Sequence, residues 1–328
     1  MTEALRALAV LLEPPGPEHA AIAAALELPA PPAPDEHTAV VVFQAYPYAS
    51  VYLGAEGMLG GEARDRVAGF WRALGGEPPG EPDHLSVLLA GVAALAAPAP
   101  AALVGPAPAA FVGPAPAALV GAAPAASARR GLPLAGAAPA ASVCGALFWE
   151  HVASWMPPYL ALLVRIGGPF HAAWAELAAT VLGELAADLG PPARLPLALR
   201  TAPALPAAPA SLDDLLATLL APARTGFVIV RDDLERAAAD LGLGLRAGER
   251  RFALRALLGQ DPAGVLGWLA AEARSQAQSF VVLPPITGWW AARAHVGAAW
   301  LDELAALAGR DGAASSSPTV GLKLSPSS

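Results

Sequence analysis

The side chains of this sequence that could carry chemistry are its six histidines, its carboxylates and one cysteine. The histidines stand at positions 19, 37, 84, 151, 171 and 295, and none is followed four residues later by another, as in helical zinc sites. No serine lies in a Gly-x-Ser-x-Gly elbow, and Gly242, Gly244 and Gly248 have the wrong spacing for a dinucleotide loop. We therefore expect a protein that is not an enzyme and that holds no metal or cofactor.

One short run brings two acids, a proline and a histidine together. It is Glu81-Pro82-Asp83-His84, directly before a long apolar stretch. On pattern alone the run is typical of a helix start, because proline suits the first turn and an acid there complements the helix dipole by ~0.3–1 kcal/mol. The sequence predicts a buried helix over residues 85–97 that begins at this run.

Apolar residues recur at helical spacing on both sides of the run and predict the elements around it. The expected helices of the first half cover residues 5–12, 17–28, 40–43, 62–74, 148–156 and 170–185. We expect Gly75-Gly76 to end the helix over 62–74, and Pro157-Pro158 to end the helix over 148–156. Strand patterns are almost absent, so the fold class is all-α.

Residues 98–142 form a Pro/Ala-rich insertion built on the octapeptide Pro-Ala-Pro-Ala-Ala-Leu-Val-Gly. Such prolines block helical hydrogen bonds and favour extended backbone. We interpret the segment as a low-complexity insertion, disordered or semi-extended. Because its prolines begin at Pro98, the apolar run before it is shorter than the ~20 residues of a membrane span.

The composition divides the rest of the chain into further parts. A helical domain over 1–190 is followed by a Pro-rich linker over 191–210 and a second helical unit over 211–310. Its expected helices cover residues 213–220, 232–241, 248–258, 262–277 and 288–308. The polar tail over 311–328 should be disordered.

Residues 232–258 have the pattern of two helices joined by a glycine turn, and the second carries Arg250, Arg251 and Arg255. A DNA-recognition helix needs basic residues on the side that faces the groove. Acids in the same segment nearly balance these arginines, and packed helix pairs are common. Structural packing is favoured, and a DNA-binding regulator is the alternative function.

The overall charge favours a cationic partner over a nucleic acid. The formal net charge is −8 and the sequence pI is about 5.2. The single cysteine, Cys144, excludes an intramolecular disulfide and a Cys-rich metal cluster. The N-terminal residues show no export signal. We expect a cytoplasmic protein.

The segment Tyr46–Leu89 carries paired tyrosines, a glycine-broken loop, an amphipathic helix and the Glu81-Pro82-Asp83-His84 run. It resembles the TorD/DmsD (NarJ-like) family of cytoplasmic chaperones for molybdenum redox enzymes, whose signature is a Glu-Pro-x-Asp-His or closely similar run. The resemblance covers residues 5–189 apart from the insertion. Residues 194–308 are more weakly similar to the C-terminal extension of longer, actinobacterial-type members.

The resemblance implies a TorD-like helical bundle that binds the apo-precursor of a molybdopterin-dependent oxidoreductase and its twin-arginine leader until the cofactor is inserted. Glu81 and Asp83 would pair with leader arginines, because arginine forms bidentate contacts with carboxylates. His84 would hydrogen-bond nearby, and three aromatic residues would offer apolar walls, although core packing explains them at least as well. These aromatic residues are Tyr48, Tyr52 and Trp155. The family includes domain-swapped dimers, so a homodimer is compatible with it.

Overall fold

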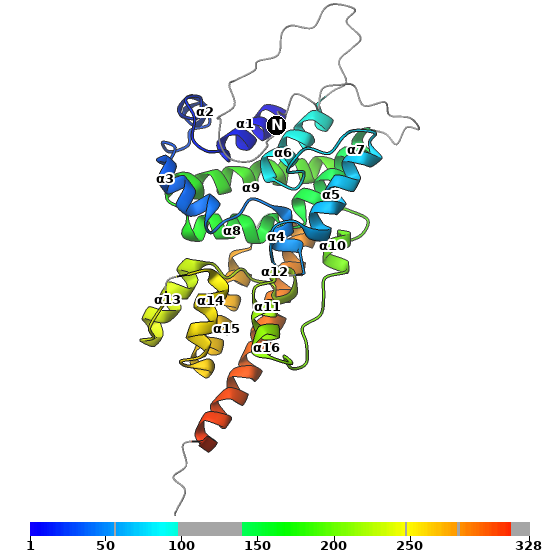
Figure 1. Ribbon diagram of the computed structural model, residues 1–328. Helices are drawn as coiled ribbons and strands as arrows, with labels where there is room; N and C mark the ends of the chain where they lie inside the picture. The colour runs from blue at the N-terminus through cyan, green and yellow to red at the C-terminus, as the bar shows by residue number, and fades with distance from the viewer. Residues whose placement is uncertain (56, 98–139, 247, 281–282, 316–328) are drawn as a thin grey trace, which may run out of the picture.

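The computed structural model describes residues 1–55, 57–97, 140–246, 248–280 and 283–315 (Figure 1). Within these residues the fold is helical without strands, as the sequence predicts, and the helices of the first half of the chain lie above those of the second half in Figure 1. The first half contains α1 (Thr2–Leu11), α2 (His19–Ala25), α3 (Pro34–His37), the π-helical turn η1 (Thr38–Val42), α4 (Ala49–Leu53), α5 (Gly61–Ala73), α6 (Leu85–Ala96), α7 (Ala140–Ala146), the π-helical segment η3 (Leu147–Ala153), α8 (Met156–Ile166) and α9 (Pro169–Leu189).

The core of this half forms where α1, α6, α8 and α9 pack together. α6 confirms the predicted helix after the Glu81–His84 run, and its apolar residues face inward on several sides. Helix α5 confirms the helix expected over 62–74, and Gly75 follows it with φ of 78°, a left-handed conformation that glycine adopts without strain. The local helix signals therefore predicted these two elements closely.

Two expectations for the first half are confirmed only in part. Pro157 and Pro158 do not simply end a helix: they occupy the first turn of α8, where a missing backbone N–H costs nothing. The residues expected as a buried helix over 40–43 form η1 and the residue after it, with Val40 and Val41 buried but Phe43 exposed. The pattern of apolar residues could not predict either outcome. A pair of prolines is compatible with the end of one helix or the start of the next, and a short apolar run does not show which of its residues are buried.

The linker at the start of the second half contains a short helix. The linker over 191–210 includes the single-turn helix α10 (Leu197–Arg200), whose Leu197 amide donates to the Glu150 carboxylate at 2.7 Å. The remaining helices are α11 (Leu212–Leu219), α12 (Pro222–Thr225), α13 (Arg231–Leu241), α14 (Arg250–Leu258), α15 (Pro262–Ser279) and α16 (Pro284–Ser315).

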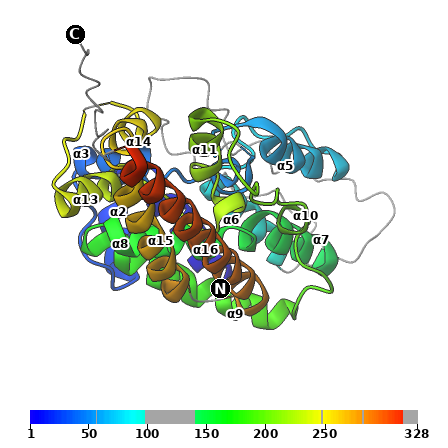
Figure 2. The same ribbon diagram turned by 90° about the horizontal axis from the view of Figure 1, so that it is seen from below.

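The extension shares a hydrophobic core with the first half. Helix α16 places Ile286 and Trp290 in the same buried cluster as α8 and α9, and the Trp290 indole donates to the Ser154 carbonyl at 2.9 Å. Figure 2 shows α15 and α16 side by side, crossing α8, and both contact it. The residues expected as a separate helical unit therefore complete the core of the first half as well as forming a second cluster of their own.

A charge network with two buried acids, here called the Arg165 cluster, also joins the two halves. It consists of Arg165 on α8, Asp233 and Arg236 on α13, and Glu272 on α15. Arg165 pairs with Asp233 and lies 3.4 Å from Glu272, while Arg236 lies 2.7 Å from Asp233 and 3.1 Å from Glu272. Burial lowers the pKa of Arg165 to about 10, so it stays charged at neutral pH.

The boundaries of the low-complexity segments need two corrections. Most of the expected insertion lies outside the described residues, but its last three residues begin α7. The expected disordered tail begins inside α16, which continues to Ser315, and residues 316–328 lie outside the described part. No helix among the described residues has the length and apolar character that crossing a membrane requires.

Candidate functional site

The Glu81–His84 run lies against the N-terminus of α4, and we call this place the motif corner. Tyr48 and His84 form an isolated antiparallel bridge. The Leu85 amide donates to the Pro47 carbonyl at 2.8 Å, and the Ala49 amide donates to the Asp83 carbonyl at 3.0 Å. Backbone hydrogen bonds thus fix the motif beside the paired tyrosines, which are more than thirty residues earlier in the sequence.

Asp83 has a structural position at this corner. Its side chain is buried, with 1% of its surface exposed, and its Oδ2 accepts a hydrogen bond from the Ser50 amide at 3.1 Å. Ser50 lies in the first turn of α4, whose N-cap residue Tyr48 supplies no side-chain cap. Asp83 therefore satisfies the N-terminus of α4 from a distant part of the chain. Its carboxylate is engaged within the chain in this structure.

Glu81 is the exposed acid of the corner. The Tyr48 hydroxyl donates to Glu81 Oε2 at 2.9 Å, which orients the carboxylate and leaves its other oxygen open. Burial first, and then the hydrogen bond to Glu81, raise the pKa of Tyr48, so it stays a donor at neutral pH. Both residues line a surface pocket of about 290 Å³. The full lining is Tyr48, Leu59, Gly60, Arg64, Gly80, Glu81 and Asp83.

His84 begins α6. Its Nδ1 accepts from the Ser86 amide at 3.3 Å and lies 2.6 Å from the Ser86 hydroxyl, which in turn donates to Glu13 at 2.5 Å. The Tyr48 ring meets the His84 ring edge-on at a centroid distance of 4.8 Å. Burial lowers the pKa of His84, more than Glu13 and the motif acids raise it, so the ring is neutral at pH 7. It caps a helix and supports Tyr48.

Tyr52 and Trp155 were expected as apolar walls for a partner, and the structure places them elsewhere. Their side chains are 1% and 0% exposed. The two rings stack at a centroid distance of 5.1 Å and both pack on Tyr159, and the Trp155 indole donates to the His151 carbonyl at 2.8 Å. These aromatic residues belong to the core, so of the six expected site residues only Tyr48, Glu81 and His84 remain near the surface.

Sequence reasoning missed three residues beside the motif. Met58 and Leu59 are 66% and 57% exposed, and Leu59 lines the pocket beside Glu81. Adjacent exposed apolar side chains are a signal of a binding surface. Arg64 lies on the other side and donates to the Gly80 carbonyl at 2.9 Å. The sequence alone could have flagged Met58-Leu59 as an apolar pair between glycines.

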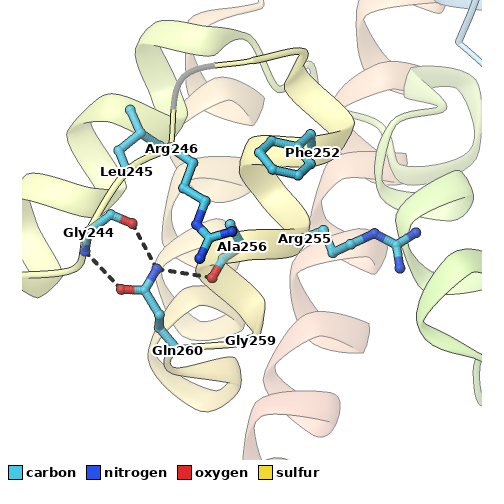
Figure 3. A pocket seen from close by; sticks show the side chains of 8 residues that line it. All are labelled: Gly244, Leu245, Arg246, Phe252, Arg255, Ala256, Gly259 and Gln260. Carbon is cyan, nitrogen blue, oxygen red and sulfur yellow. Dashed lines mark hydrogen bonds between the residues drawn. The ribbon is translucent and has the colours of Figure 1, made fainter.

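The helix pair α13–α14 carries the second pocket, of about 590 Å³, at the turn between the two helices (Figure 3). Gln260 fills part of this turn by bonding the Gly244 amide at 2.9 Å and the Gly244 carbonyl at 2.7 Å. Arg255 points away from the pocket in Figure 3. Arg255 and Arg251 both pair with Asp213.

The third arginine, Arg250, is partly buried and donates to the Ile229 carbonyl at 2.8 Å. The three arginines on which the DNA-binding alternative rests are thus engaged within the chain. They do not form the free basic face that a recognition helix presents to a groove.

No group of three or more histidine, cysteine, aspartate or glutamate side chains in the described residues could hold a metal ion. What the site offers is an oriented, exposed carboxylate beside two exposed apolar side chains. Such an arrangement can bind a basic and apolar segment, without bond-making chemistry.

Residues 39–110 match the family model described as the nitrate reductase delta subunit. No curated protein and no solved structure matches the chain significantly. The matched segment contains α4, α5, the motif corner and α6, and the all-α fold agrees with it. Over residues 39–110 the chain is therefore similar to the NarJ/TorD-type family of molybdoenzyme maturation chaperones.

Proposed function

We propose that this protein is a cytoplasmic chaperone that binds the apo-precursor of a molybdopterin-dependent oxidoreductase through its twin-arginine leader. In this proposal the leader contacts the motif corner and is released after cofactor insertion, before export. The match of residues 39–110 to the nitrate reductase delta subunit family supports a general role in molybdoenzyme maturation. The observation that carries the finer proposal is the exposed Glu81 carboxylate, oriented by Tyr48 and flanked by Met58 and Leu59.

Typical interaction energies indicate different roles for the Glu81 carboxylate and for the apolar pair Met58 and Leu59. A solvent-exposed ion pair contributes only ~0–1 kcal/mol, so a contact between Glu81 and a leader arginine would give selectivity more than affinity. Full burial of a leucine or methionine side chain contributes ~1.5–3 kcal/mol. Met58 and Leu59 would therefore supply most of the favourable free energy, against the apolar part of a leader.

The net charge of −8 supports the choice of partner. A negatively charged protein attracts a basic leader during diffusional encounter, an effect that salt screens. Arg64 opposes it locally, because its guanidinium group lies in the same pocket as Glu81. Binding and release of an immature client need no catalysis, only a higher affinity for the immature state.

The test is co-purification from the native host grown anaerobically, with mass spectrometry of the bound proteins. We expect a molybdoenzyme precursor that retains its leader, and we expect Glu81→Gln to reduce its recovery severalfold. Glu77→Gln is the matched control, because Glu77 is exposed, is close in sequence and does not line the pocket. Equal recovery with both variants would reject the motif corner, and the absence of any such precursor would reject the client.

A further inference from the structure

The exposed residues Met58 and Leu59 belong to a short loop, residues 57–60, that contacts the C-terminal extension at one end. Gly57 is buried and has φ of 61°. A Cβ added at Gly57 would lie 1.8 Å from the Leu220 carbonyl oxygen, which follows α11. Only glycine allows this approach, so the backbone of the loop is fitted closely against the extension.

Arg250 of α14 makes a second contact with the same end of the loop. Its guanidinium group donates to the Ile229 carbonyl at 2.8 Å and lies 3.5 Å from the Gly57 carbonyl oxygen. The side chain is partly buried, and burial lowers its pKa. The helices on either side of this loop are also neighbours. Figure 1 shows α4, which precedes the loop, directly above α11 and α12, and α4 contacts α12.

The other end of the loop is attached to the motif corner. The Gly60 amide donates to the Ser50 hydroxyl at 3.1 Å, and the Ser50 amide donates to the buried Asp83 carboxylate. The two apolar side chains of the loop thus stand between an attachment to the motif and an attachment to the extension. Neither attachment uses the side chain of Met58 or Leu59, which stay free for a partner.

We propose that the extension positions the 57–60 loop, and that Arg250 and the Leu220–Gly57 contact thereby set the affinity of the motif corner for the apolar part of a leader. Arg250 is a positioning residue in this account, since it acts through the loop and does not touch the partner. The inference rests on the proposed function. It gives the extension a role in binding that the motif segment alone does not supply.

The experiment combines two readouts on the full chain. Hydrogen exchange of peptides covering residues 57–60 reports whether the loop is held. Fluorescence anisotropy reports the binding of a labelled synthetic peptide that carries an Arg-Arg pair followed by a leucine-rich segment. The test variants are Arg250→Met and Gly57→Ala, and thermal melting of each confirms that it folds.

Each variant has a matched control. Gly61→Ala places a side chain at a similar φ of 68° where nothing lies within 4 Å, so it adds backbone strain without disturbing the extension. Arg251→Met removes the neighbouring arginine, which pairs with Asp213 and not with the loop.

We expect both test variants to exchange faster at 57–60 and to bind the peptide about tenfold more weakly, since two side chains must then be ordered again on binding. Both controls should stay within about twofold of the wild type in each readout. Unchanged exchange in the test variants overturns the inference, and so does faster exchange with unchanged affinity. If the wild type does not bind the peptide while the test variants still loosen the loop, the proposed function fails, and the role in affinity fails with it.

Discussion

The Arg165 cluster and the motif corner both gather charged residues from distant parts of the chain, but they differ in exposure. In the cluster, Asp233 and Glu272 are 0% and 8% exposed and both contact two arginines. At the corner, Asp83 is buried and satisfied by backbone, whereas Glu81 is exposed and held by one neutral donor. A closed network of this kind holds helices together, and an open carboxylate on a fixed support can exchange partners.

The largest effect expected from this comparison is in the Arg165 cluster. Arg165→Met should lower the free energy of unfolding by ~3 kcal/mol, because it leaves the buried Asp233 with fewer compensating charges. Urea unfolding followed by circular dichroism measures it. The control is Arg274→Met, which breaks the exposed pair with Asp302 and should cost ~0–1 kcal/mol. An equal loss of unfolding free energy in both variants would contradict the distinction between buried, fully paired charges and exposed ones.

Within the corner itself, the two acids should separate stability from binding. Asp83→Ala should destabilise the protein by ~1–3 kcal/mol, because the Ser50 amide at the start of α4 loses its buried acceptor. Glu81→Gln should change stability by less than ~0.5 kcal/mol, as surface substitutions do. Unfolding curves of the two variants give the answer, and a stability loss from Glu81→Gln as large as from Asp83→Ala would contradict it.

A third buried group extends the comparison to pH. The rings of His37 and His171 lie 6.0 Å apart in the interior, and neither ring nitrogen of His171 has a hydrogen-bond partner in the described residues. Burial, then the charge of His171, lowers the pKa of His37 from 6.5 to about 4. Because the unfolded chain binds the proton more tightly, the stabilising contribution is full above pH 6.5 and is lost as the pH falls toward 4.

Through His37 the free energy of unfolding should therefore drop by ~1–2 kcal/mol between pH 7.5 and pH 5. His37→Phe should flatten this dependence, and His295→Phe, which changes an exposed histidine, is the matched control. Urea midpoints at the two pH values provide the measurement. A slope that His37→Phe does not alter would assign the acid sensitivity to other groups.

The smallest expected effect concerns Arg64, which shares the pocket with Glu81. Arg64→Gln should strengthen binding of an Arg-Arg peptide by a factor of about two to three, because it removes a like charge from a solvent-exposed site. The gain should shrink as salt is added. Anisotropy titrations at two ionic strengths test this, and weaker binding would show that Arg64 supports the pocket through the Gly80 carbonyl.

The comparison also explains which features could be predicted from the sequence. Helix α5, helix α6 and the all-α class follow from local periodicity and helix-end residues, and the matched family agrees with the resemblance in Tyr46–Leu89. The burial of Tyr52 and Trp155 could not be predicted from the sequence, because an aromatic residue on a helix face packs equally well in a core or under a ligand.

The C-terminal extension shows most clearly which contacts the sequence does not predict. Its helices were predicted one by one, but nothing local indicates that Trp290 enters the first core or that Asp233 meets Arg165. Such contacts join residues far apart in the chain, and periodicity shows only which face is buried, not what covers it. The same limit hid the contact between Gly57 and Leu220.

The most direct test of the account is a titration of the wild type and of Glu81→Gln with two labelled peptides that share a leucine-rich segment and differ in an Arg-Arg or Ala-Ala pair before it. The account predicts tighter binding of the Arg-Arg peptide to the wild type, and a smaller preference in Glu81→Gln, the signature of direct coupling. Equal affinity of the wild type for both peptides, or a preference that Glu81→Gln leaves intact, would contradict it.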